Sequence, residues 1–318
     1  MNYRTISDLN QIILRQLHIL PRDFDLIVGI PRSGMLPANL LALYLNRPYT
    51  DLDSFVNGHI YNAGARGEFF DIKTLKRVLV VDDSVASGAA LDKCKKKLMP
   101  FLADFDFSYC VIYALPESKN SVDYYFEEVP LPRYFQWNIL NHIILEKACF
   151  DIDGVLCVDP TDDQNDDGEK YIDFLLNAPP LFVPGCQIGT LVTSRLEKYR
   201  SQTEEWLRKN NVKYNKLVMS EHSSMEERRR ANSHATHKAK EYNSSSYSLF
   251  VESSLDQALE INRLTGKPVL CTQNFEMIFD SKSVFYNIKS GHSLPFVRRS
   301  LLWLRDQVRN RIMIRSKS

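Results

Sequence analysis

Two pairs of aspartates follow apolar segments of this sequence, and both pairs suit phosphate chemistry. Asp82 and Asp83 stand after one such segment, and Asp151 and Asp153 stand after another. A carboxylate can accept hydrogen bonds from sugar hydroxyls, attack phosphorus as a nucleophile or transfer a proton. Because ligands of parallel α/β sheets bind at the carboxyl ends of the strands, we expect each pair to mark a site.

A short loop rich in serine and small residues separates the first pair from a predicted helix. In such a loop the backbone N–H groups and the positive end of the helix dipole face an anion, and serine hydroxyls add donors. We predict that the anion is a sugar phosphate whose vicinal hydroxyls bind the two carboxylates. The predicted binding residues are Asp82, Asp83, Ser84, Val85, Ala86, Ser87 and Gly88.

An earlier segment also leads from a predicted strand into a helix. It places Arg32, Ser33 and Gly34 where a second anion can bind. Together the two segments resemble the type I phosphoribosyltransferase family. The resemblance implies that the sugar phosphate is 5-phosphoribosyl 1-pyrophosphate (PRPP) and that the Arg32 loop binds its pyrophosphate. Purine-salvage members of this family carry an aspartate where this chain has Ala86, so a 6-oxopurine is not the expected acceptor.

The same resemblance places residues 50–70 at the mobile loop that closes over the family's active site. This region contains Asp51, Asp53, His59 and Arg66 among glycines, which fits a lid that excludes water. A sugar hydroxyl acceptor needs a general base because it is a poor nucleophile while protonated. We predict Asp53 for this role, with a solvated loop acid as the alternative.

Asp151 and Asp153 have the spacing of a nucleophile and its acid partner. Phosphoryl transfer through an aspartyl-phosphate needs one carboxylate that attacks phosphorus and a nearby acid that protonates the leaving oxygen. Mg²⁺ would offset the negative charge shared by the carboxylate and the phosphate. The segment resembles motif I of the haloacid dehalogenase-like (HAD) phosphatase superfamily.

The resemblance to HAD phosphatases extends to three further segments in the expected order along the chain. It implies that Thr193 binds phosphoryl oxygens and that Lys238 neutralises the aspartyl-phosphate. Lys216 and Lys240 are rivals for the lysine role.

The last of these segments ends in Glu252, an acidic metal ligand by the same resemblance. The implied ligands of Mg²⁺ are Asp151, Asp153 and Glu252, although Ser253 stands where a second acid is commoner. The stretch between the first two motifs is small for a cap domain, so we expect an open site. Its acidic residues, expected to form a solvated loop, are Asp159, Asp162, Asp163, Asp166, Asp167 and Glu169.

Alternating strands and helices are predicted to position both sites. Predicted strands cover 24–30, 77–81, 107–113, 147–152, 188–192, 248–251 and 268–270, and predicted helices cover 35–46, 89–102, 198–209, 224–241 and 255–264. This pattern predicts an α/β fold with two doubly wound, mostly parallel-sheet domains, separated by a strand-poor stretch at 116–137. The predicted domains are a phosphoribosyltransferase-like domain (1–145), a HAD-like Rossmannoid domain with a small cap insertion (146–290) and a basic amphipathic C-terminal helix (291–318).

The C-terminal segment and the bulk charge bear on partners and location. Residues 294–318 contain seven Lys or Arg and one Asp, with apolar residues at helical spacing. Such a helix can dock on protein or lie on an anionic membrane surface. The sequence has no signal-peptide pattern and no long apolar stretch, which predicts a cytoplasmic protein, either soluble or peripheral on the inner membrane face. A formal net charge of +1 gives no argument for a nucleic-acid partner.

The order of the two resemblances predicts a bifunctional enzyme. It resembles enzymes of bacterial surface-polysaccharide assembly (O antigen or capsule), in which PRPP donates phosphoribose to a glycan and the 5-phosphate is then hydrolysed to leave ribofuranose. The predicted partners are PRPP, a lipid-linked glycan acceptor and Mg²⁺. The sequence also leaves open whether the protein forms a homo-oligomer. Two alternatives are a nucleobase transferase fused to a nucleotidase, and a PRPP-sensing domain that controls a phosphatase.

Overall fold

The structure, a computed structural model, describes residues 1–61, 74–165, 167–224, 226–227 and 234–280. It divides into two compact units, Met1–Leu140 and Asn141–Ser318. The sequence places the boundary near residues 139–146, with the predicted domains drawn as 1–145 and 146–290. Both units are α/β with mostly parallel sheets, as the sequence predicts. The predicted C-terminal helix at 291–318 and the predicted lid residue Arg66 lie outside the described residues.

The sheet of the first unit has five parallel strands in the order β3-β2-β4-β5-β6. Their bounds are β2 (Leu26–Gly29), β3 (Tyr49–Asp51), β4 (Arg77–Val85), β5 (Asp106–Ala114) and β6 (Tyr124–Glu128). Two further strands, β1 (Asn2–Arg4) and β7 (Arg133–Phe135), pair with each other. The strand order reverses between β2 and β4, and ligands of doubly wound sheets bind at such a point.

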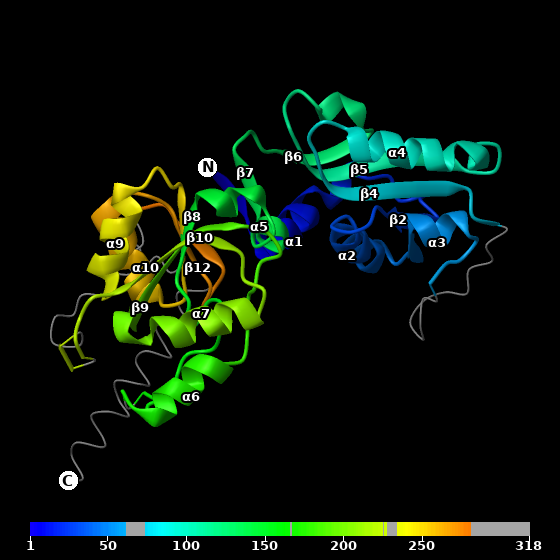
Figure 1. The fold of residues 1–318 in the computed structure, drawn as a ribbon. Coiled ribbons are helices and arrows are strands. Elements are labelled where there is room, and N and C mark those ends of the chain that lie inside the picture. The colour runs from blue at the N-terminus through cyan, green and yellow to red at the C-terminus, as the bar shows by residue number, and fades with distance from the viewer. Residues whose placement is uncertain (62–73, 166, 225, 228–233, 281–318) are drawn as a thin grey trace, which may run out of the picture. The chain divides into compact units, whose positions relative to one another are not determined.

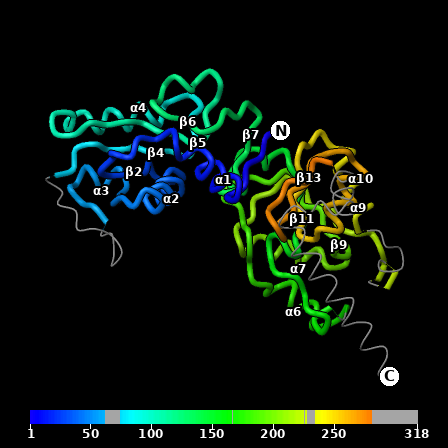
Figure 2. The backbone as a smooth tube through the Cα atoms, turned by 180° about the vertical axis from the view of Figure 1, so that it is seen from behind, coloured from blue at the N-terminus to red at the C-terminus, as the bar shows by residue number. Residues whose placement is uncertain are grey.

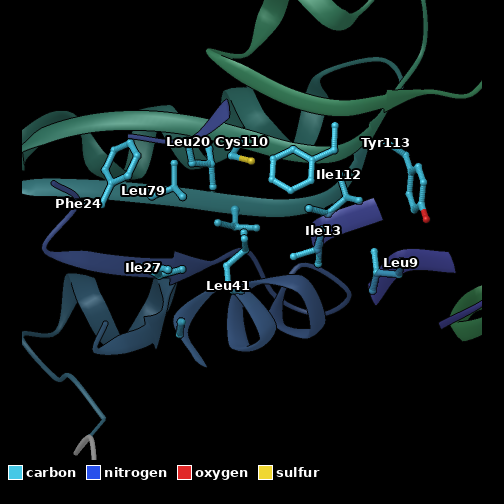
Figure 3. Packing of buried hydrophobic residues seen from close by; sticks show 14 of the residues in the cluster. Leu9, Ile13, Leu20, Phe24, Ile27, Leu41, Leu79, Cys110, Ile112 and Tyr113 are labelled. Atoms are coloured by element: carbon cyan, nitrogen blue, oxygen red, sulfur yellow. The ribbon is translucent and has the colours of Figure 1, made fainter. Parts of the chain in front are cut away.

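Helices cover both faces of this sheet, and α2 and α4 lie on opposite sides of it (Figure 1). The helices are α1 (Ile6–Gln16), α2 (Met35–Leu45), α3 (Leu52–Val56), α4 (Ala89–Leu98) and α5 (Gln136–Ile139). Leu9 and Ile13 of α1 and Leu41 of α2 pack on one face of the strands (Figure 3). Phe55 of α3 and Cys94 of α4 pack on the other.

The sheet of the second unit has the order β10-β9-β8-β11-β12-β13, and its order reverses between β8 and β11. Only β13 pairs antiparallel among these strands. The bounds are β8 (Ala148–Phe150), β9 (Ile188–Leu196), β10 (Tyr214–Ser220), β11 (Leu249–Glu252), β12 (Val269–Cys271) and β13 (Glu276–Ile278).

Two helix pairs belong to this unit, α9 with α10 and α6 with α7 (Figure 2). They are α6 (Glu169–Asn177), α7 (Arg200–Lys209), α9 (His234–Ser244) and α10 (Leu255–Thr265). Trp206 anchors α7, because its ring is buried and its Nε1 donates to the carbonyl of Ala178 at 2.8 Å. Within the described ranges, none of the helices is both long and apolar enough to cross a lipid bilayer.

Several elements differ from the sequence prediction, and β1, α1, β3, α6, β10 and β13 were not predicted. The stretch 116–137, predicted to be poor in strands, contains β6 and β7. Strand β4 continues to Val85, so that part of the predicted phosphate loop is strand. The beginning of the predicted lid is the end of β3 followed by helix α3, because the carboxylate of Asp51 accepts the backbone N–H groups of Asp53 and Ser54 and caps that helix.

Candidate active sites

The first candidate site lies where the strand order of the first unit reverses. The loop after β2 carries Arg32 and Ser33, and β4 carries Asp82 and Asp83. Ser33 Oγ donates a hydrogen bond to Asp83 Oδ1 at 3.0 Å. The structure therefore brings together the two segments that the sequence predicts to bind one ligand.

Gly34 allows this close approach between the loop and the strand. A Cβ atom at this position would lie 2.5 Å from the carbonyl oxygen of Ile30 and 2.8 Å from both Asp82 Oδ1 and the carbonyl oxygen of Val81. Two of these three atoms are backbone carbonyl oxygens, which cannot shift without a cost in free energy. Any side chain here would separate the Arg32 loop from the carboxylates.

The two carboxylates of the first site have different surroundings. Asp83 is 4% exposed, and its Oδ2 accepts the indole N–H of Trp137 at 2.6 Å. Asp82 is partly exposed, and its Oδ1 accepts the backbone N–H of Asp83 at 2.8 Å. Burial raises the pKa of Asp82 to about 8, and the neighbouring Asp83 carboxylate adds to the shift.

The loop that can hold a phosphate is shorter than predicted. Ser84 and Val85 belong to β4, so the loop consists of Ala86, Ser87 and Gly88 before α4 begins. Gly88 has a φ of +78°, a left-handed conformation that favours glycine. Ala86 and Ser87 are exposed, so the loop is open to a ligand at the positive end of a ten-residue helix.

The structure does not bring Asp53 to this site. Its carboxylate pairs with Lys97, near the C-terminal end of α4. At about 1.5 Å of rise per residue, Lys97 lies roughly 12 Å along the helix from its first residue, Ala89. Asp53 is also largely exposed, with 63% of its side-chain area open to solvent, as expected for the alternative of a solvated acid.

The second candidate site contains a buried cluster of opposite charges. Lys238 Nζ donates to Asp151 Oδ2 at 2.6 Å and to Glu252 Oε2 at 2.7 Å. All three side chains are buried, and they reach the cluster from α9, from the residue after β8 and from the end of β11. Burial raises the pKa of Asp151 above its usual range, and Glu252 and Asp153 add to this effect while Lys238 opposes it.

The rival lysines lie elsewhere. Lys216 forms an ion pair with Glu241 at 2.7 Å, and Lys240 is exposed. Of the three lysines considered from the sequence, Lys238 is the one whose ammonium group contacts Asp151.

Asp153 is held by an arginine to which the sequence analysis assigned no role. Arg195 is fully buried, and its Nη2 and Nε donate to Asp153 Oδ1 and Oδ2 at 2.6 and 3.1 Å. Thr193 is buried too, and its Oγ1 accepts the backbone N–H of Arg195 at 3.2 Å. The Oγ atom of the neighbouring Ser194 forms a hydrogen bond with His234 Nδ1 at 2.8 Å. Ser194 and Asp151 line the same cavity.

A cavity of about 600 Å³ opens above this cluster. Its acidic lining residues are Asp151, Asp153, Asp159 and Asp256. Asp159 is exposed, as expected for a solvated loop, yet it also lines this cavity, where partial burial of the carboxyl group and the charges of Asp153 and Glu252 raise its pKa. Asp256 was missed, although its position four residues after Glu252, on the first turn of α10, places it near the end of β11.

The cavity supplies carboxylate oxygens, the ligand type that Mg²⁺ prefers. Hard divalent cations prefer carboxylate oxygens, and here the acids outnumber the cations Lys238 and Arg195. In the part of the chain that the structure describes, no three Asp, Glu, His or Cys side chains converge into a preformed cation site. The two cations occupy carboxylate oxygens at which a metal would otherwise bind.

No family model matches the chain. The chain is similar to the solved Helicobacter pylori xanthine-guanine-hypoxanthine phosphoribosyltransferase, at 18% identity over 43% of this chain and 92% of that chain, with a TM-score of 0.33. A purine phosphoribosyltransferase from Pyrococcus horikoshii Ot3 matches at 21% identity over 43% and 92%, with a TM-score of 0.32. A hypothetical protein from Neisseria gonorrhoeae with bound ppGpp matches at 20% identity over 44% and 91%, with a TM-score of 0.32. These matches concern the fold of less than half of the chain.

Proposed function

We propose that the chain is a bifunctional enzyme that transfers ribosyl 5-phosphate from PRPP to a glycan hydroxyl and then hydrolyses the 5-phosphate, which leaves a ribofuranose unit in a bacterial surface polysaccharide. One observation carries the proposal. Each compact unit has an acidic pair at the carboxyl edge of a central strand, beside the point where its strand order reverses. Two successive phosphate reactions, one in each unit, account for both pairs.

In the first unit, the proposed substrate PRPP would bind across the reversal point. Asp82 and Asp83 would accept the ribose hydroxyls, the loop before α4 would bind the 5-phosphate and Arg32 would bind the pyrophosphate. The acceptor oxygen forms its bond to ribose C1 while the bond from C1 to pyrophosphate breaks, and the hydroxyl proton passes to the departing pyrophosphate or to solvent. The contact between Ser33 and Asp83 supports this assignment, because it joins the two binding segments.

In the second unit, Asp151 would attack the 5-phosphate and form an aspartyl-phosphate. The ester oxygen would leave with a proton from Asp153, and water would then release inorganic phosphate. Lys238 supports this role for Asp151, because its ammonium group lies beside the nucleophile. Bound Mg²⁺, held by Asp151, Asp153 and Glu252, would offset the charge between carboxylate and phosphate.

The class of acceptor is proposed from the side chain at position 86, which is exposed. Ala86 offers no carboxylate to the proton of a base nitrogen, which supports an acceptor other than a 6-oxopurine. The lipid-linked form of the glycan and the membrane contact of residues 291–318 remain predictions, because those residues lie outside the described structure.

The proposal is tested by incubating the protein with PRPP and Mg²⁺, with and without a lipid-linked glycan, and following both products by mass spectrometry. We expect pyrophosphate to appear only with the glycan, followed by inorganic phosphate. Pyrophosphate release with a free nucleobase instead would support the salvage alternative. PRPP binding without turnover of any acceptor would support a regulatory domain.

A further inference from the structure

The buried carboxylate of Asp83 has a donor on each oxygen. Ser33 Oγ donates to one oxygen at 3.0 Å, and the indole N–H of Trp137 donates to the other at 2.6 Å. A carboxylate buried without donors is costly, and hydrogen bonds to a charged group are shorter and stronger than neutral ones. The orientation of Asp83 therefore depends on Trp137 as well as on the Arg32 loop.

The ring of Trp137 is itself held by an aromatic stack. Its centroid lies 5.0 Å from that of Phe135 with an interplanar angle of 10°, and Phe135 stacks on Tyr113 at 5.2 Å and 20°. Tyr113 belongs to the apolar core beneath the sheet (Figure 3). The indole N–H is thus aimed at Asp83 by rings anchored in the core.

The next residue of α5 contacts the other anion-binding segment. Asn138 Oδ1 accepts a hydrogen bond from Arg32 Nη2 at 3.0 Å. Adjacent residues of one short helix therefore hold the carboxylate of β4 and the guanidinium of the loop after β2. A ligand that spans this pair of groups would meet them already oriented.

We propose that Trp137 and Asn138 are the positioning residues of the PRPP site, an inference that rests on the transferase function proposed above. Trp137 orients Asp83 toward the ribose hydroxyls, and Asn138 orients Arg32 toward the pyrophosphate. Each acts through its partner side chain and without contact to the substrate. Binding of the ribose hydroxyls therefore depends on Trp137, and binding of the pyrophosphate depends on Asn138.

The substitution Trp137→Phe keeps an aromatic ring on the stack and removes the N–H donor. By titration calorimetry on the full-length protein with Mg²⁺, we expect its affinity for ribose 5-phosphate to fall about tenfold or more, since a hydrogen bond to a charged group is lost, and its affinity for pyrophosphate to stay unchanged. Asn138→Ala should give the opposite pattern. Tyr113→Phe is the matched control, because it removes a buried hydroxyl that has no hydrogen-bond partner in the described structure, and it should change neither affinity.

A purely structural role for α5 would give a different result. Unchanged affinity of Trp137→Phe for ribose 5-phosphate, or an equal loss of both affinities in either variant, would overturn the positioning roles. Wild-type protein that binds neither ribose 5-phosphate nor pyrophosphate would overturn the transferase function itself, and the inference with it. The wild-type titration therefore separates the two failures.

Discussion

The ammonium group of Lys238 offsets the negative charge of two buried carboxylates, Asp151 and Glu252. Its ammonium group lies within hydrogen-bond distance of Asp151 and Glu252, and 1% of the lysine side chain is exposed. Charges buried in this way are tolerated only when they are paired and hydrogen-bonded. At the scale of single residues, the arrangement proposed for catalysis and the stability of the second unit therefore depend on the same contacts.

Replacing Lys238 by an uncharged residue of similar length should test this dependence. Lys238→Met leaves Asp151 and Glu252 buried together, and we expect the free energy of unfolding to fall by about 3 to 5 kcal/mol in denaturant titrations. Lys216→Met is the control, because its pair with Glu241 is largely exposed on the lysine side and is worth less than about 1 kcal/mol. Equal losses in the two variants would contradict the account.

Arg195 should act on activity through the orientation of Asp153. A lysine lacks the planar fork that contacts both oxygens of Asp153, so Arg195→Lys should lower hydrolysis of a ribose 5-phosphate ester about a hundredfold, within the range of a misplaced general acid. Arg200→Lys changes exposed pairs with Glu197 and Glu204 and a hydrogen bond to the carbonyl of Leu217. None of these groups lines the cavity, so the variant should leave the rate unchanged. Steady-state phosphate release measures both rates, and full activity in Arg195→Lys would refute the role.

Asp82 should make stability depend on pH. Its pKa rises from 3.8 to about 8 on folding, so between these values the native protein keeps a proton that the unfolded chain has lost. Stability from this group is therefore full at low pH and lost as pH rises toward 8. Asp82→Asn cannot ionise, so its free energy of unfolding should decline less over this pH range than that of the wild-type protein. Urea unfolding across this range measures the slope, and parallel curves for both proteins would contradict the shift.

At the scale of elements, the sequence predicts those strands and helices that a local pattern of apolar and loop residues determines. The strand that carries Asp82 and the strand that precedes Asp151 are visible as apolar runs, and the helix after Gly88 follows from the loop composition. Strand β6 was missed because prolines and acidic residues surround an edge strand that is only partly buried. Arg195 and Trp137 were missed because each meets its aspartate across a long sequence separation, which no local pattern reports.

The approach of the Arg32 loop to β4 should be sensitive to Gly34. Gly34→Ala would place a Cβ atom against the carbonyl of Ile30 and against Asp82, so we expect a loss of about 1 to 3 kcal/mol in stability, as for other overpacked sites, together with weaker PRPP binding. Gly185→Ala is the control, because its nearest contact would be Asn141 Oδ1 at 3.5 Å. Denaturant titration and calorimetry measure both effects, and tolerance of alanine at position 34 would contradict the close approach.

At the scale of the whole molecule, the chain joins two units that each contain their own acidic pair and their own reversal of strand order. No side chain placed in one candidate site belongs to the other unit. We therefore propose that the two reactions occur in series at two independent sites. In this proposal the product of the first site, a 5-phosphorylated ribosyl group, would be the substrate of the second.

The most direct test separates the two steps with one substitution. Asp151→Asn, given PRPP, Mg²⁺ and a lipid-linked glycan, should release pyrophosphate at the wild-type rate and accumulate a glycan that keeps the 5-phosphate, observed by mass spectrometry. Adding a variant with both Asp82→Asn and Asp83→Asn should then release inorganic phosphate from that product. Loss of pyrophosphate release in Asp151→Asn, or failure of the second variant to remove the phosphate, would contradict two independent sites acting in series.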